Sequence, residues 1–167
     1  MYSSNQPVTV TETIKTTTIT GGPITHPPRG GLTQELKQKF APLGTITFRP
    51  IEGKFYHDND IIGKMDPYCK FKIGWRSGKS SVAKSQGTHP IWSGDAITIK
   101  VKDQQFAKLK VKDSDKLRLD NRLGVAQIPL ALVIQRGKVT QWIPVAKKGI
   151  TTGEILVEMY FTPHVTV

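Results

Sequence analysis

The sequence has little cysteine, no long apolar run and no recognisable targeting segment. Cys69 is the only cysteine among 167 residues, so an internal disulfide is excluded and a reduced, cytoplasmic compartment is the simplest expectation. The longest apolar run, residues 128–134, is far shorter than the roughly 20 residues of a membrane span. The first residues lack an apolar secretory segment, and Tyr2 stands where myristoylation needs glycine. We therefore expect any membrane contact to be peripheral.

The chain is strongly basic, but its acidic residues are gathered in two places. The formal net charge is +11 at pH 7, which favours an anionic partner such as acidic lipid, nucleic acid or an acidic filament. Residues 45–167 carry twenty Lys and Arg against eleven Asp and Glu, and six of these acids lie in segments 58–66 and 113–120. A uniformly basic nucleic-acid-binding protein has no need of such segments, so we expect no nucleic-acid partner.

Residues 1–44 differ in composition from the rest of the chain. Segment 8–20 is rich in threonine and partly alternating, and residues 21–31 are rich in glycine and proline. This composition predicts a flexible tail and linker. A short helix is expected over residues 33–40, with Thr33 as its cap. The folded domain is then expected over residues 45–167.

From residue 45 onward, short runs of strand-forming residues are separated by turn residues. Cys69, Phe71 and Ile73 alternate with Lys70 and Lys72, which is typical of a half-buried strand in an antiparallel sheet. Eight such runs predict an all-β fold, an eight-stranded antiparallel β-sandwich. The expected strands are 45–51, 67–74, 79–84, 95–102, 106–113, 123–130, 138–145 and 153–161. Only residues 130–135 suggest a helical turn.

Two acidic turns carry the clearest chemical signal. Asp58, Asp60 and Asp66 lie in the first, and Asp113, Asp115 and Asp120 lie in the second. Carboxylates this close repel one another unless a cation lies between them, and Ca²⁺ takes six to eight oxygen ligands in flexible loops. Neither segment has the spacing of an EF-hand. The two turns therefore predict a calcium-binding cup at one end of the sandwich.

Several motifs in order resemble the C2 domain family. Residues 63–68 (GKMDPY) resemble the family signature G-x-S-D-P-Y, with Met65 in place of serine. Residues 88–92 (THPIW) are similar to T-x-N-P-x-W, with His89 in place of asparagine. Residues 113–124 resemble the third-loop pattern D-x-D-x(5)-D-x-x-G. The resemblance implies a β-sandwich that binds calcium and phospholipid, and the position of the strands favours the permuted, type II order.

The resemblance, which covers about residues 45–162, also implies a set of calcium ligands. These are Asp60, Asp66, Asp113, Asp115 and, at the fifth position, Asn121. Asn121 keeps an amide oxygen but lacks the charge, and Asp120 beside it is a candidate substitute. Fewer charged ligands weaken calcium affinity. The alternative, an acidic loop pair that no longer binds calcium, therefore stays open.

The predicted loop tips carry apolar and basic residues. In the family, the positions of Ile61 and Leu117 enter the bilayer interface, and Ile62 and Leu119 lie beside them. Lys116 and Arg118 alternate with the leucines and would meet lipid phosphates, each contributing about 1 kcal/mol near an anionic surface. The alternative is that these apolar residues, Ile62 above all, fold inward as local core.

A second basic surface is expected on the strand after the first acidic turn. Tyr68, Lys70 and Lys72 match the first half of the lysine-rich phosphoinositide site of some C2 domains. The second half is less evident, because Lys79 and Lys84 are out of the expected register and Lys112 stands where an aromatic residue is common. A solvated lysine face that prevents sheet aggregation is the alternative.

We expect no catalytic role. The four histidines are scattered, and Cys69 lies on the strand face that is expected to be core, where a lone cysteine packs and does not react. Phe71 and Phe106 are also expected in the core, which leaves no aromatic residues on the basic faces for stacking with bases.

The sequence thus predicts calcium-dependent, peripheral binding to acidic phospholipid, in the cytoplasm at the membrane surface. The rival hypothesis is a scaffold of C2-like fold that is neither catalytic nor calcium-dependent. Its tail, residues 1–44, and its basic surface would then bind a protein assembly such as the cytoskeleton.

Overall fold

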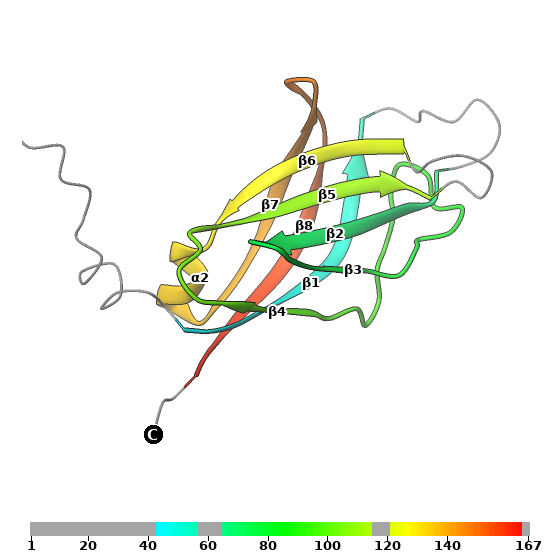
Figure 1. Ribbon diagram of the computed structural model, residues 1–167. Coiled ribbons are helices and arrows are strands. Elements are labelled where there is room, and N and C mark those ends of the chain that lie inside the picture. The colour runs from blue at the N-terminus through cyan, green and yellow to red at the C-terminus, as the bar shows by residue number, and fades with distance from the viewer. Residues whose placement is uncertain (1–42, 57–64, 115–120, 165–167) are drawn as a thin grey trace, which may run out of the picture. The chain divides into compact units, whose positions relative to one another are not determined.

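The computed structural model describes residues 43–56, 65–114 and 121–164, and the predicted all-β fold is confirmed (Figure 1). The strands are β1 (Gly44–Phe55), β2 (Pro67–Ile73), β3 (Arg76–Lys79), β4 (Ile97–Val101), β5 (Phe106–Asp113), β6 (Asn121–Pro129), β7 (Lys138–Lys147) and β8 (Ile150–Pro163). The expected helical turn is α2 (Ala131–Arg136). Within the described ranges, no helix is long and apolar enough to cross a membrane.

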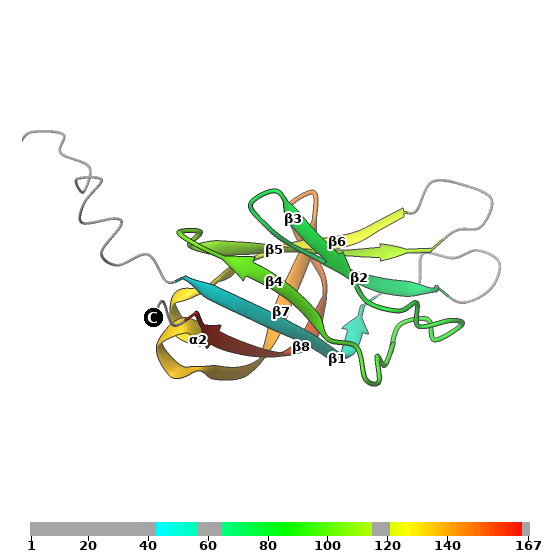
Figure 2. The same cartoon turned by 60° about the horizontal axis from the view of Figure 1, so that its bottom comes forward.

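The strands form two layers in the permuted order that the sequence favours. Their order is β3-β2-β5-β6-β7-β8-β1-β4, and every neighbouring pair is antiparallel. Only Val125 and Ala146 pair between β6 and β7, so the sheet divides there into the two layers seen in Figure 2. The last strand, β8, lies between β7 and β1, as the type II order requires.

The core lies between the two layers and follows the predicted alternation. Cys69, Phe71 and Ile73 are buried, whereas Lys70 and Lys72 are exposed. The ring of Phe71 stacks on the ring of Phe48 from β1, with 4.5 Å between the ring centroids. Because β1 and β2 belong to opposite layers, this contact joins the layers face to face.

The prediction of a strand over residues 79–84 is wrong. β3 covers Arg76–Lys79 and pairs with β2. The ladder ends at Ser80, whose hydroxyl oxygen accepts a hydrogen bond from the backbone N–H of Cys69 at 2.9 Å, where a strand would present a backbone carbonyl. The chain then enters a long connection to β4. Residues 1–42 of the tail, with the expected helix 33–40, lie outside the described residues, and Gly44 already belongs to β1.

Candidate functional site

Three of the six predicted calcium ligands meet where β2, β5 and β6 end. Pairing of β2 with β5 places Pro67 opposite Asp113, and pairing of β5 with β6 places Asp113 opposite Asn121. Asp66 immediately precedes β2. The three strand ends lie together at the right of Figure 1. We call Asp66, Asp113 and Asn121 the acidic corner.

Backbone hydrogen bonds fix both carboxylates of the acidic corner. The N–H of Asp66 donates to Oδ1 of Asp113 at 2.7 Å, and the N–H of Ser85 donates to Oδ1 of Asp66 at 2.6 Å. The carbonyl of Asp66 accepts a hydrogen bond from the N–H of Ser114 at 3.0 Å. Asp113 is only 6% exposed. The two side chains are therefore held in place by the fold itself.

The two turns that resemble family motifs pack on each other and support Asp66. The indole N–H of Trp92 donates to the carbonyl of Pro67 at 3.2 Å, and the N–H of Gly87 donates to the carbonyl of Met65 at 3.0 Å. Met65 and Trp92 are both buried. Met65, which stands where the family motif has serine, is therefore a core residue. Asp66 follows it directly and lies immediately before β2.

The acidic corner fits part of a calcium site. Two carboxylates and one amide supply the hard oxygen donors that Ca²⁺ prefers. Within the described ranges, no group of three His, Cys, Asp or Glu residues is placed to hold a metal ion; the third member of this corner is an amide. The other three predicted ligands, Asp60, Asp115 and Asp120, lie outside the described residues, as do the predicted membrane-contacting residues Ile61, Ile62, Lys116, Leu117, Arg118 and Leu119. For these nine positions the predictions stand as predictions.

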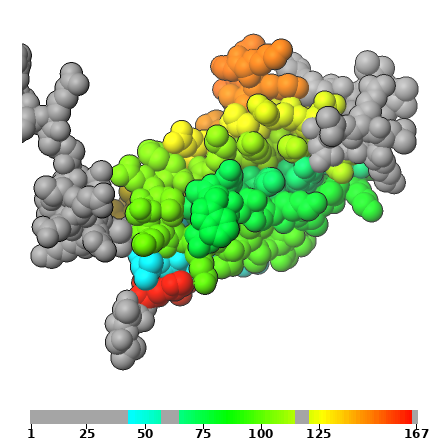
Figure 3. All heavy atoms as spheres, in the orientation of Figure 1, coloured from blue at the N-terminus to red at the C-terminus, as the bar shows by residue number. Residues whose placement is uncertain are grey.

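A continuous basic surface covers the outer side of β3, β2, β5 and β6. Lys70 lies between Lys79 on one side and Lys110 on the other, so the prediction that Lys79 is out of register is wrong. The remaining pairs of cations place Lys72 opposite Lys108 and Lys112 opposite Arg122. We call the following residues the lysine face: Lys70, Lys72, Lys79, Lys108, Lys110, Lys112 and Arg122. Figure 3 presents this side of the molecule toward the viewer.

Tyr68, the third residue predicted for the basic site, is buried beneath this surface. It is only 7% exposed and pairs opposite Lys112. The ammonium of Lys79 lies 5.7 Å from the centroid of its ring, within reach of a cation–π contact. The predicted residues Tyr68, Lys70 and Lys72 are therefore brought together, with Tyr68 as a support for the lysines.

Among the residues that the structure describes, no ion pair joins a cation of the lysine face to an acid. The pKa of Lys110 is lowered, first by partial desolvation and then by the charges of Arg122 and the neighbouring lysines. The three ion pairs found among the described residues, Arg49–Glu158, Lys54–Glu154 and Lys138–Glu158, lie on β1, β7 and β8 in the other layer. The lysine face therefore carries a positive field that an anionic surface would relieve.

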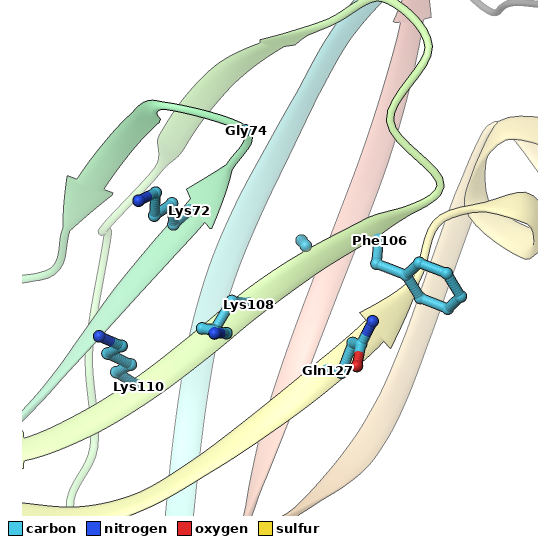
Figure 4. Close-up of a pocket in the computed structure, with 7 residues that line it drawn as sticks. Lys72, Gly74, Phe106, Lys108, Lys110 and Gln127 are labelled. Atoms are coloured by element: carbon cyan, nitrogen blue, oxygen red, sulfur yellow. The ribbon is translucent and has the colours of Figure 1, made fainter.

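The end of the lysine face far from the acidic corner is hollowed. Lys72, Lys108, Lys110 and Gln127 line a hollow of about 360 Å³, together with Gly74 and Phe106 (Figure 4). Phe106 is 45% exposed, so its expected place in the core is wrong. Its position, two residues before Lys108 on β5, gives it the same side of the strand as the lysines.

Cys69 has no access to a substrate in the described structure. It is fully buried, and burial, followed by the charge of Asp95, raises the pKa of its thiol well above the usual value. The thiol therefore stays protonated at neutral pH and is a poor nucleophile.

Comparison with known proteins agrees with the motifs. A model of the C2 domain family matches residues 44–145. The 16 kDa phloem protein 2 of Arabidopsis thaliana is 32% identical over 123 residues, which cover 73% of this chain and 84% of the relative. Elicitor-responsive protein 3 of Oryza sativa subsp. japonica is 30% identical over 122 residues, which cover 72% of this chain and 85% of the relative. A solved C2 domain-containing protein from an elicitor-responsive gene superposes with a TM-score of 0.65 at 30% identity, over 75% of this chain and 93% of that one.

Proposed function

The chain belongs to the C2 domain family, and we propose that it binds acidic phospholipid membranes peripherally and that calcium regulates this binding. Members of this family often bind membranes and calcium. The proposed role is one of binding and not of catalysis, at the cytoplasmic surface of a membrane. The buried, protonated Cys69 supports the non-catalytic part.

One observation carries the proposal: a lysine face that forms no ion pair among the described residues and adjoins the acidic corner on the same strands. Lys112 immediately precedes Asp113 on β5, and Arg122 immediately follows Asn121 on β6. Each basic residue near an anionic membrane contributes about 1 kcal/mol, so several of the seven acting together suffice for stable but reversible docking. Phosphoinositides, which carry several phosphates on one headgroup, match this density of charge best.

Asp66, Asp113 and Asn121 are the residues that would hold Ca²⁺, together with the predicted ligands Asp60, Asp115 and Asp120. When bound there, the ion supplies positive charge where the protein would otherwise repel lipid phosphate. The acidic corner then joins the lysine face as one positive surface. The predicted tip residues Ile61, Ile62, Leu117 and Leu119 would enter the bilayer interface, while Lys116 and Arg118 meet the phosphates.

The scaffold hypothesis depends on residues 1–44, of which residues 1–42 lie outside the described residues. No observation favours a cytoskeletal partner, so this hypothesis stays a prediction.

Co-sedimentation with phosphatidylserine vesicles, in calcium and in chelator, tests the calcium mechanism. We expect calcium to strengthen binding of the wild-type protein and not of Asp113→Asn, which keeps the oxygen that accepts the hydrogen bond from Asp66. Asp103→Asn is the matched control, because Asp103 follows β4 and contacts Gln104 instead. If wild-type protein and Asp113→Asn bind equally in calcium and in chelator, the corner is not a calcium switch.

A further inference from the structure

Two large aromatic side chains are exposed at the end of the lysine face that lies far from the acidic corner. Trp75 is 79% exposed, more than any other large apolar residue in the described ranges, and Phe106 is 45% exposed. Trp75 forms the turn between β2 and β3 with Gly74, which takes a positive φ of 57°. An indole in this position adds nothing to the core and is available for contact with a partner outside the described fold.

Strand pairing places both aromatic residues at one end of the face. Lys72 lies opposite Lys108; Gly74 follows Lys72 by two residues, and Phe106 precedes Lys108 by two. Gly74 and Phe106 both line the hollow in Figure 4. β5 runs from Phe106 to Asp113, a distance of about 23 Å at the rise of an extended strand. The lysine face therefore has the acidic corner at one end and the two aromatic residues at the other.

The charges around Trp75 and Phe106 indicate the chemistry of the partner. The guanidinium of Arg76 lies 4.2 Å from the centroid of the Trp75 ring, and Lys72, Lys108 and Lys110 surround the hollow beside Phe106. A partner must therefore offer anionic groups directly beside an apolar layer. Tryptophan and other amphipathic aromatic residues favour the interface of a bilayer, and an acidic membrane has its phosphates at that depth.

We propose that Trp75 and Phe106 form an aromatic anchor that enters the interface of an acidic phospholipid bilayer. The lysine face then lies against the headgroups along its whole length, and the hollow between the anchor and the lysines receives headgroup phosphate. This inference rests on the proposed function. It adds the orientation of the domain on the membrane and a component of membrane binding that does not need calcium. Docking through the loop end alone would leave Trp75 in water.

Tryptophan fluorescence of the full chain tests the contact directly. The three tryptophans are Trp75, Trp92 and Trp142, and Trp92 is only 3% exposed. In a Trp142→Phe background, Trp75 is the one exposed indole. With vesicles of phosphatidylserine and brominated phosphatidylcholine in chelator, we expect a blue shift and quenching of Trp75. Bromine near the headgroup should quench more than bromine deep in the chains.

A binding comparison tests whether the anchor contributes affinity. We expect Trp75→Ser/Phe106→Ser to weaken binding to acidic vesicles in chelator by about tenfold or more. Ile150→Ser is the matched control, because Ile150 is 72% exposed on β8 in the other layer and should change binding less than twofold. All variants replace exposed side chains, and circular dichroism checks that they fold.

The outcomes separate this inference from the proposed function. Vesicle binding that leaves Trp75 unshifted and unquenched overturns the aromatic anchor and leaves peripheral lipid binding intact. No vesicle binding in either calcium or chelator overturns both. Quenching of Trp75 by a single-stranded oligonucleotide, with no effect of vesicles, would assign the lysine face to nucleic acid and overturn the membrane anchor.

Discussion

Removing two charges from the centre of the lysine face should weaken membrane binding and stabilise the fold at the same time. The variant is Lys108→Gln/Lys110→Gln, which keeps most of each side-chain stem and removes both ammonium groups. Each lysine near an anionic surface contributes about 1 kcal/mol. Loss of both therefore corresponds to about 2 kcal/mol, or roughly a 30-fold weaker vesicle affinity.

The same variant relieves repulsion within the sheet. Lys110 lies opposite Lys70, and Lys108 lies opposite Lys72; the lowered pKa of Lys110 reflects these neighbouring charges after the effect of desolvation. Like charges directly opposite each other destabilise a sheet by a few tenths of a kcal/mol per pair, up to about 1 kcal/mol. We expect the free energy of unfolding to rise by about 0.5–1 kcal/mol, and the midpoint of thermal unfolding by a few degrees.

Vesicle titration at two salt concentrations and urea unfolding measure the two effects. Lys100→Gln/Lys102→Gln is the matched control, since it removes one lysine from β4 in the other layer and one that directly follows this strand. If the control loses as much affinity as the β5 variant, net charge and not the lysine face determines binding. If the β5 variant is less stable than the wild type, the expected repulsion between the paired lysines of β2 and β5 is refuted.

Three further changes test other parts of the structure. Asn121→Asp places a carboxylate opposite Asp113, so we expect a lower unfolding midpoint in chelator and a higher calcium affinity by isothermal titration calorimetry; no gain in affinity would contradict the ligand assignment. Gly124→Ala would bring a Cβ to within 2.8 Å of the Val145 side chain, and overpacking should cost about 1–3 kcal/mol in urea unfolding, whereas an unchanged midpoint would show that β6 and β7 can separate freely. The pKa of Glu158 is lowered, chiefly by a hydrogen bond from Lys138 on β7, so the stabilisation by Glu158 is present above pH 4.5 and is lost as the pH falls through the folded pKa. The difference in melting temperature between the wild type and Glu158→Gln should therefore shrink below pH 4.5. A difference that persists at pH 2 would refute this coupling.

The strands and the acidic corner could be predicted because their signals are local and repeated. Cys69, Phe71 and Ile73 alternate with lysines over a whole strand, and alternation of this length leaves one way to bury the apolar side. The order of the acidic motifs along the chain also placed Asp66 and Asp113 at one end of the sandwich, where pairing of β2 with β5 brings them together.

β3 and the lysine pairs could not be predicted because they depend on register. Arg76–Lys79 has no buried alternation, so nothing in its composition separates it from the polar residues that follow. The approach of Lys79 to Lys70 depends on a two-residue turn between Ile73 and Arg76, and a slip of one residue would place Lys79 on the opposite side.

Phe106 shows how the hydrophobic character of a residue can mislead. Its spacing from Lys108 and Lys110 indicates the lysine side of β5, but an apolar residue at the start of a strand suggests core. The structure follows the spacing. With Phe106 exposed beside the lysines, a nucleic-acid base could stack on its ring. An oligonucleotide is therefore a competing ligand for the lysine face.

Binding to vesicles of phosphatidylcholine with and without phosphatidylserine, at low and high salt and saturating calcium, tests the central claim most directly. Acidic phospholipid binding through a continuous positive surface predicts that affinity rises steeply with the phosphatidylserine fraction and falls as salt is added. Equal binding to neutral and acidic vesicles, or no binding to either, would contradict it.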